Sequence, residues 1–337
     1  MADFTEYGRP SAEWIALEST LPEAPKNLSV EQMKALVNKG REATAAQDMV
    51  DGLAAEVQLH DYTITARDGT PLEARSYRPV GVPISERLPV YVHFHGGEGY
   101  PGRGLEYQLP THPEYPYPTA WNDSEDSFVW LHEHIAEIGG ISEQVIVGGI
   151  SAGAWLTASL ALAQLRGEDK RLAACPKIAG QILMIPCLVQ WDHYAPRLEQ
   201  LKSPDLSSYV QCADAPVLPV ARMKLFDGLL ELSNAKDSAG ARRMNPGNAT
   251  AEEVKDLPPT TFGIAGNDPL RDEGLFYGQH LAANGIPTNV NVFPGVPHGF
   301  RRYKQLPDSK RWDEVMSDGI AWALTKPAPG PFEIKSK

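Results

Sequence analysis

Runs of apolar residues recur along the chain and alternate with segments of helical period. Between 55 and 79, apolar and polar residues alternate on both sides of the turn signal Asp68-Gly69, which predicts an antiparallel pair of strands. A run rich in β-branched and aromatic residues predicts a buried strand at 88–95, and two later apolar runs predict buried strands at 143–150 and 178–189.

Helical patterns separate and follow these runs. They predict helices over 122–138, 152–165, 271–285 and 309–324, and two further strands are predicted over 260–270 and 288–300. Because strands that alternate with helices build βαβ units, we expect an α/β protein with a mostly parallel central sheet flanked by helices.

Two segments fall outside this alternation. Residues 1–50 have a helical pattern, in which Ser29 precedes Gln32 by the three positions of a capping box. Residues 190–255 are irregular and partly helical, and they carry aromatic side chains that we expect to be exposed. We expect these parts to form a helical cap over the carboxyl edge of the sheet. The expected division is a cap segment at 1–54, a cap insertion at 190–255 and a core at 55–189 and 256–337.

Composition narrows the function classes. Of the 337 residues, 42% are hydrophobic and 22% are charged, and the net charge of -12 disfavours nucleic acid and anionic membranes as partners. The N-terminus lacks the basic and apolar regions of a secretory signal, and no stretch has the ~20 apolar residues that span a bilayer. We therefore expect a cytoplasmic protein without stable membrane insertion. The three cysteines match no metal or redox spacing and are interpreted as reduced, mostly buried thiols.

The predicted strand at 143–150 runs directly into the sequence GISAG at 149–153, and a predicted helix follows. This is the pattern G-x-S-x-G in the strand–turn–helix context that a nucleophilic serine requires. A tight turn lifts the hydroxyl of Ser151 out of the sheet, while the flanking glycines let the strand and the helix approach each other. The pattern alone also describes a glycine-rich turn with a capping serine, so a base and an acid are needed elsewhere.

A serine hydroxyl needs a base, and the base needs an acid to orient it. In proteins that carry the serine on such a turn, the order along the chain is Ser, Asp, His, which leaves His280 and His298 among nine histidines. His298 lies in a loop after a predicted strand, whereas His280 lies inside a predicted helix and is interpreted as a surface or packing residue. Asp268 follows a strand and is the candidate acid. Asp272 and Glu273 begin the next helix, where we interpret them as compensating its dipole.

Acyl transfer also requires hydrogen-bond donors for an oxyanion. The N–H group of Ala152 is the first candidate because it directly follows the nucleophile. The segment His95-Gly96-Gly97 ends a predicted strand, and Gly96 and Gly97 are further candidates because a glycine leaves its N–H group open to the substrate.

The chain resembles the hormone-sensitive-lipase-like branch of the α/β-hydrolase fold family, which includes carboxylesterases. The resemblance covers most of residues 60–325 and rests on ordered motifs: HGG at 95–97, YPYPTAW at 115–121, GISAG at 149–153, NDPLRDEG at 267–274 and HGF at 298–300. It implies an α/β-hydrolase fold with a helical cap. It also implies that the nucleophile, acid, base and oxyanion donors are, in that order, Ser151, Asp268, His298 and the group Gly96, Gly97 and Ala152.

Three departures from the family pattern bear on the site. Glu98 takes the place of a third glycine, and a carboxylate beside the oxyanion site would oppose the negative charge that develops there. Ile150 replaces an acidic residue before the nucleophile. Before residue 115 the family has a helix and a full strand within its sheet, but residues 98–114 are too few for both. Either 104–109 forms a shortened strand, or the sheet pairs in another order, or the sequence carries a deletion.

Other chemistries match the sequence less well. The glycines of 97–102 fit the dinucleotide pattern G-x-G-x-x-G, but prolines interrupt the helix that this pattern must open. The pairs His93-x-His95 and His132-x-His134 lack further ligands for zinc. A ligand-binding protein without turnover, and a lyase or cyclase that uses the same triad, both stay open as alternatives.

We therefore predict a serine hydrolase of the carboxylesterase type that cleaves a small apolar ester or lactone through an acyl-enzyme. The sequence is compatible with a homodimer and indicates no cofactor, no metal and no nucleic-acid partner. Several apolar side chains of the expected cap favour either an apolar pocket or the core of the cap itself: Trp14, Trp191, Tyr194, Met223 and Phe226.

Overall fold

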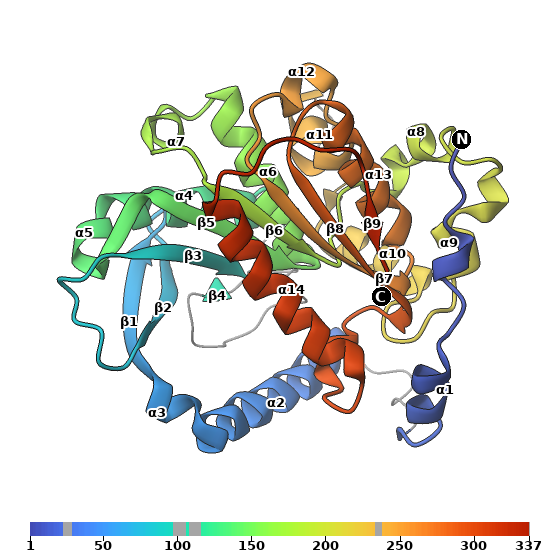
Figure 1. Ribbon diagram of the computed structural model, residues 1–337, viewed down its shortest axis with the longest axis horizontal. Helices are drawn as coiled ribbons and strands as arrows, with labels where there is room; N and C mark the ends of the chain where they lie inside the picture. Colours follow the sequence, from blue (N-terminus) through green and yellow to red (C-terminus); the bar gives the residue numbers. More distant parts are fainter. Residues whose placement is uncertain (23–28, 97–105, 108–115, 233–237, 337) are drawn as a thin grey trace.

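A computed structural model of the chain describes residues 1–22, 29–96, 106–107, 116–232 and 238–336 (Figure 1). Within these ranges, seven parallel strands form the central sheet in the order β4-β3-β5-β6-β7-β8-β9. The strands are β3 (Leu88–Phe94), β4 (Glu106–Tyr107), β5 (Gly140–Ile150), β6 (Gly180–Met184), β7 (Thr260–Asn267), β8 (Thr288–Pro297) and β9 (Ile334–Lys335). The predicted parallel α/β sheet is thereby confirmed, and β9 is an edge strand that the sequence pattern did not indicate.

The strand predicted over 178–189 is shorter than expected, because β6 ends at Met184. Ile185 has a φ of 42°, which a β-branched residue rarely adopts, and Pro186 has no N–H group for a strand ladder. The chain therefore leaves the sheet at Ile185, on the carboxyl side of β6.

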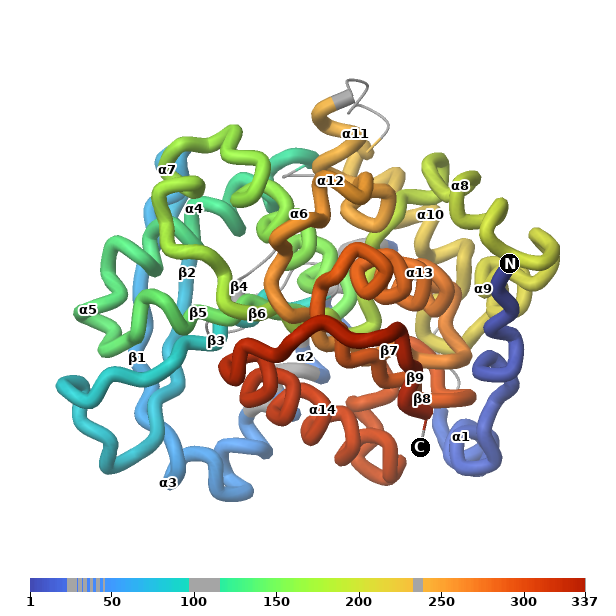
Figure 2. Tube along the Cα trace, turned by 45° about the horizontal axis from the view of Figure 1, so that its top comes forward, coloured from blue at the N-terminus to red at the C-terminus, as the bar shows by residue number. Residues whose placement is uncertain are grey.

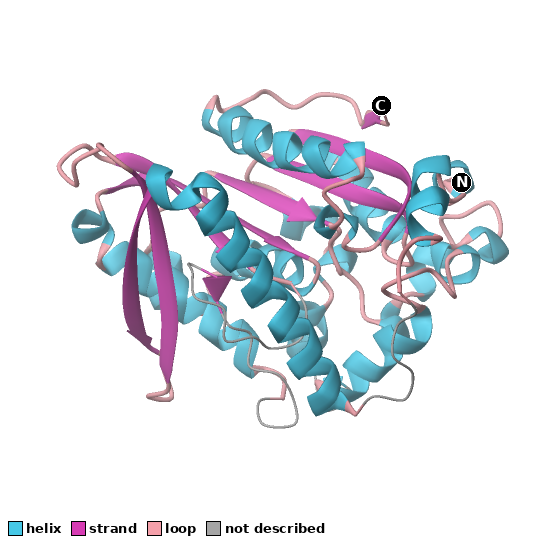
Figure 3. Ribbon diagram, turned by 90° about the horizontal axis from the view of Figure 1, so that it is seen from below, coloured by secondary structure: helices cyan, strands magenta, loops and turns pink. Residues whose placement is uncertain are grey.

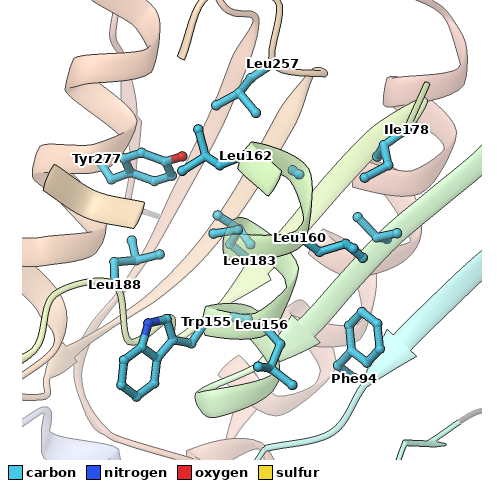
Figure 4. Packing of buried hydrophobic residues seen from close by; sticks show 14 of the residues in the cluster. Phe94, Trp155, Leu156, Leu160, Leu162, Ile178, Leu183, Leu188, Leu257 and Tyr277 are labelled. Atoms are coloured by element: carbon cyan, nitrogen blue, oxygen red, sulfur yellow. The ribbon is translucent and has the colours of Figure 1, made fainter. Parts of the chain in front are cut away.

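Helices cover both faces of the sheet (Figures 1 and 3). One face carries α4 (Thr119–Glu133), α6 (Ala152–Arg166) and α13 (Arg271–Ala283), and the other carries α14 (Pro307–Leu324). Strand side chains alternate between these layers, since Val145 and Val147 join the cluster with α6 while Ile146 joins the cluster with α14. Figure 4 shows side chains of α6 packed around Leu183 of β6 in the larger cluster.

The predicted antiparallel pair is a hairpin of β1 (Val57–Thr65) and β2 (Pro71–Pro79). Among the described residues it forms a sheet of its own, and Figure 3 shows it standing apart from the central sheet. The shortened strand expected within 104–109 is β4, whose two residues pair with His93 and Phe94 at the sheet edge. Because β4 is so short, it offers little backbone for the hairpin to join.

The helical pattern of residues 1–50 is confirmed in part. The helices there are α1 (Ala12–Glu18) and α2 (Val30–Asp48), and the expected capping box joins Ser29 N to Gln32 Oε1 at 2.9 Å and Gln32 N to Ser29 Oγ at 3.2 Å. The first 11 residues are wrongly predicted, since they contain only the 3-10 turn η1 (Thr5–Tyr7). A kinked π-helical turn η2 (Met49–Leu53) and α3 (Ala54–Glu56) lead into β1.

The segment between β6 and β7 is mostly short helices, and its part around α8 (Ala195–Leu198) and α9 (Ser208–Gln211) lies beside the N-terminal residues (Figure 2). Ala2 forms a β-bridge with Leu201, and Gln211 Nε2 donates to Thr5 O at 2.9 Å. The helices of this segment are η3 (Trp191–His193), α8 (Ala195–Leu198), η4 (Pro204–Leu206), α9 (Ser208–Gln211), α10 (Val220–Leu229), α11 (Ser238–Met244), η6 (Pro246–Asn248) and α12 (Ala251–Val254). Elsewhere lie α5 (Ile135–Ile138), α7 (Lys170–Ala174) and η7 (Phe300–Arg302). No helix in the described parts of the chain is both long and apolar enough to cross a bilayer.

Candidate active site

Ser151 stands on the turn between β5 and α6 in a backbone conformation that is rare outside glycine, with φ 57° and ψ -118°. Its N–H group donates to Met184 O at 2.9 Å, which ties the turn to the end of β6. A Cβ atom on Gly153 would lie 1.9 Å from Phe94 O, and one on Gly149 would lie 2.3 Å from the carbonyl carbon of Gly153. Both glycines are therefore required for the close approach of strand and helix.

The three predicted triad residues come together in one hydrogen-bonded chain. Ser151 Oγ lies 2.9 Å from His298 Nε2, and His298 Nδ1 lies 2.7 Å from Asp268 Oδ2. Asp268 follows β7 and His298 follows β8, so neighbouring parallel strands deliver both side chains to the same edge as Ser151. The other oxygen of Asp268 accepts from Leu270 N at 3.0 Å, which holds the carboxylate in place. The arrangement suits proton transfer from the serine hydroxyl to the imidazole.

Two of the three predicted oxyanion donors lie among the described residues. Ala152 begins α6, whose first N–H groups have no acceptor within the helix. Gly96 is buried and lies against the nucleophile: a Cβ atom there would lie 3.0 Å from Ser151 Cβ and 2.3 Å from Ile150 O. Gly97, Glu98 and the glycine pattern at 97–102 lie outside the described residues.

Glu273 is buried in the first turn of α13 and accepts specific hydrogen bonds. Its Oε2 atom accepts from the backbone N–H groups of Leu188 and Val189, the latter at 2.7 Å, and its Oε1 atom accepts from the Tyr209 hydroxyl at 3.0 Å. Burial raises the pKa of Glu273 to about 8. The interpretation of this residue as compensating the helix dipole missed this role, because its partners lie some 64 to 85 positions earlier in the chain.

Asp272 is equally buried, and its interpretation from the sequence was incomplete in the same way. Its Oδ2 atom accepts from Ser208 N at 2.7 Å, and its Oδ1 atom accepts from Arg271 Nε at 2.8 Å. Arg271 in turn donates to Gln211 Oε1 at 2.6 Å. The start of α13 is therefore bonded to α9 of the segment between β6 and β7.

His93, His280 and the three cysteines take no part in the triad hydrogen bonds. His93 is in contact with Tyr91, whose hydroxyl lies 3.1 Å from His93 Nδ1, and burial lowers the pKa of His93 to about 4. His280 is half-buried in α13 and lies 3.4 Å from Asn284 Nδ2, as expected of a packing residue. Cys212 is buried and the other two cysteines are half-buried, all as free thiols. Among the residues that the structure describes, no group of three His, Cys, Asp or Glu side chains has an arrangement that could hold a metal ion.

The aromatic residues expected in a cap divide between core and partly exposed positions. Trp14 is buried and packs edge-to-face on Tyr303, with ring centroids 5.4 Å apart, so it belongs to the cluster under α14. Tyr194 is also buried and packs on Tyr209. Trp191 is half-buried, and the ammonium group of Lys224 lies 4.1 Å from its ring centroid. Trp14 and Tyr194 therefore pack in the core.

The chain matches the model of a family described as alpha/beta hydrolase fold over residues 105–302, which is more than half of its length. It is 30% identical to an AB hydrolase superfamily protein of Schizosaccharomyces pombe over 90% of this chain and 91% of that protein. It is 31% identical to the esterase LipI of Mycobacterium tuberculosis over 74% of this chain and 76% of that protein. The structure of vibralactone cyclase has the same fold, with a TM-score of 0.80 at 22% identity over 95% of this chain and 96% of that one.

The chain therefore belongs to the α/β-hydrolase fold family, in its hormone-sensitive-lipase-like branch of carboxylesterases, and is an esterase-type hydrolase.

Proposed function

We propose that the protein cleaves carboxylic esters through an acyl-enzyme, with Ser151 as nucleophile, His298 as general base and Asp268 as the acid that orients the imidazole. The observation that carries this proposal is the continuous chain of hydrogen bonds from Ser151 Oγ to Asp268 Oδ2, at 2.9 and 2.7 Å. The strained backbone of Ser151 supports it as well, since such strain is found where a nucleophile must be presented to a substrate.

In the first step, His298 Nε2 takes the proton of the Ser151 hydroxyl while Oγ attacks the carbonyl carbon of the ester. The N–H group of Ala152 and those of the loop at Gly96 and Gly97 would donate to the oxyanion that develops. His298 then returns its proton to the leaving alkoxide oxygen. In the second step, water gives a proton to His298 and attacks the acyl carbon, and Ser151 leaves with the proton that His298 returns.

The substrate proposed is a small, uncharged, largely apolar ester or lactone. The side chains next to the nucleophile in sequence and one helical turn away carry no charge, namely Ile150, Ala152 and Trp155. The net charge of -12 also disfavours anionic substrates. Two alternatives must be separated by experiment: a ligand-binding role without turnover, and a lyase or cyclase reaction at the same triad.

The experiment is labelling of the purified protein with a fluorophosphonate probe, followed by peptide mass spectrometry. We expect one modification, at Ser151, that is lost in Ser151→Ala and strongly slowed in His298→Ala, together with hydrolysis of 4-nitrophenyl acetate. Labelling without hydrolysis of esters or lactones would favour the lyase or cyclase alternative. Folded protein that neither labels nor hydrolyses would contradict the proposal and favour a ligand-binding role.

A further inference from the structure

Glu273 joins two parts of the chain that are far apart in sequence. It lies five residues after the acid Asp268, and its carboxyl group is buried on all sides. Three donors surround it: the N–H groups of Leu188 and Val189, and the hydroxyl of Tyr209. Both amides point at the same oxygen, so a single carboxyl group satisfies two buried backbone donors of the irregular segment after β6.

Leu188 and Val189 belong to the segment that leads from β6 into the insertion at 190–255. The same segment receives the far end of the insertion, since Gly247 N donates to Leu188 O at 2.9 Å and Gln190 N donates to Asn245 Oδ1 at 2.7 Å. Both ends of the insertion therefore meet at the two amides that Glu273 holds.

The same segment connects this junction to the turn that carries the nucleophile. The segment begins at β6, whose last carbonyl, Met184 O, accepts from Ser151 N. Leu188 belongs to the same core cluster as Trp155, which lies one helical turn after Ser151 (Figure 4). A shift of the segment would therefore move the insertion relative to the serine.

We propose that Glu273 is a positioning residue that determines substrate size: it fixes the insertion at 190–255 on the core beside the acid and thereby sets the far wall of the substrate site. This inference rests on the proposed esterase function. Glu273 takes no part in the hydrogen bonds that join Ser151, His298 and Asp268, so it does not act on the reacting atoms.

The effect of losing the Glu273 carboxyl group on turnover should therefore depend on the size of the ester. A short ester needs only the serine, the imidazole and the oxyanion donors, whereas a long ester must also reach the wall that the insertion provides. Loss of the carboxyl group leaves two buried N–H groups without their acceptor, and the segment shifts to find another. Glutamine keeps a carbonyl oxygen for both amides, so it preserves the junction.

The test compares wild type with Glu273→Ala, Glu273→Gln and Glu273→Asp, and uses Asp126→Ala as the matched control. Asp126 is another buried carboxylate that accepts a backbone N–H group, but it lies on α4, toward the β3 end of the sheet, whereas α13 packs beside β7 and β8 (Figure 1). We would measure kcat and KM for 4-nitrophenyl acetate and octanoate, the rate of Ser151 labelling by diisopropyl fluorophosphate, and hydrogen exchange of the Leu188 and Val189 amides.

We expect Glu273→Ala to lower kcat/KM for octanoate relative to acetate by about tenfold, mostly through KM, and to speed exchange of the two amides. Labelling of Ser151 by the small probe should stay within about threefold of wild type, because the triad is intact. Glu273→Gln should restore the ratio of the two esters. If Glu273→Ala does not fold, Glu273→Asp, which withdraws the oxygen by one methylene, should shift the ratio in the same direction.

An unchanged ratio of kcat/KM for octanoate to kcat/KM for acetate in folded Glu273→Ala or Glu273→Asp would overturn the inference. An equal change of this ratio in Asp126→Ala would also overturn it, because it would indicate general destabilisation. Failure of the proposed function looks different. The wild-type protein itself would then show no Ser151-dependent labelling or turnover, and this would also overturn the role in substrate size.

Discussion

Arg67, at the turn of the β1–β2 hairpin, is bonded to Asp126 of α4 through both its backbone and its side chain. Arg67 N donates to Asp126 Oδ2 at 2.7 Å, and Arg67 Nε donates to the same oxygen at 2.9 Å. Arg171 adds a third donor to this carboxylate, whose side chain is only 2% exposed. Because the hairpin forms a sheet of its own beside a two-residue β4, we infer that this contact is a main attachment of the hairpin to the core.

Asp126→Ala should therefore destabilise the protein while leaving its chemistry intact. Removal of the carboxylate leaves the buried N–H group of Arg67 without its acceptor and takes one carboxylate partner from each of the two guanidinium groups, which keep Glu125 and Asp169 as acceptors; we expect this to cost about 2–3 kcal/mol. Urea unfolding of wild type and variant measures this cost, and fluorophosphonate labelling of Ser151 checks that the site is unchanged. A difference below about 0.5 kcal/mol would show that apolar packing alone attaches the hairpin.

Asp268→Asn should abolish most of the turnover without unfolding the protein. The amide can donate to His298 Nδ1 where the carboxylate accepts, which favours the wrong imidazole tautomer and removes the charge that stabilises the imidazolium. We expect kcat to fall by roughly 10³ to 10⁴. Asp126→Asn makes the same chemical change in another buried carboxylate and should keep kcat, so steady-state kinetics of the two variants separates the role of Asp268 from a general effect.

His93 should make the protein less stable in acid. Its pKa is lowered to about 4 by burial, against about 6.5 in an unfolded chain, so the unfolded state binds more protons between these values. Its stabilising contribution is therefore complete above pH 6.5 and is lost as the pH falls through 4. His93→Asn, which keeps an acceptor for the Tyr91 hydroxyl, should show a smaller drop in Tm between pH 7 and pH 5 than wild type. Equal drops would contradict the assignment.

Glu273, by contrast, should make the protein less stable as the pH rises. Its pKa is raised to about 8, against about 4.5 in an unfolded chain, so the folded state binds more protons between these values. Stability from this group therefore falls as the pH rises from 4.5 to about 8 and levels off above that. Glu273→Gln, which cannot ionise, should flatten the decline of Tm between pH 6 and pH 9. A decline identical to that of wild type would show that the buried carboxyl group does not titrate in this range.

The parts of the site that the sequence predicted are those fixed by short-range constraints. Ser151 was predicted from five adjacent residues. Two of them must be glycine, because a Cβ atom on Gly149 or Gly153 would clash with neighbouring backbone atoms. Asp268 and His298 follow from their places after two strands. Glu273 could not be assigned in this way, because its partners Leu188 and Val189 meet it only through the packing of α13 against the segment after β6.

The edge strands and the end of β6 were also not predictable from the local sequence, because they depend on pairing with other strands. The sequence indicated that residues 98–114 were too few for a helix and a full strand, but which outcome the chain adopts depends on the pairing of β4 with β3. β9 has only two residues and is held by Val290 and Asn291 of β8, so no local pattern marks it. The early end of β6 depends on Ile185, whose N–H group donates to Gly263 O of β7 in a conformation that its side chain disfavours.

Ser151→Gly should be more stable than Ser151→Ala, although both variants lack the nucleophile. At φ 57° and ψ -118° the Cβ atom is crowded by the backbone, and only glycine adopts this conformation freely. The relief of strain exceeds the extra entropy that glycine loses on folding, so we expect a difference of about 1 kcal/mol in the free energy of unfolding. Ala154→Gly, at a buried position of regular helix in α6, should instead destabilise by about 1 kcal/mol. Urea unfolding of the three variants would contradict the strain argument if Ser151→Gly proved less stable than Ser151→Ala.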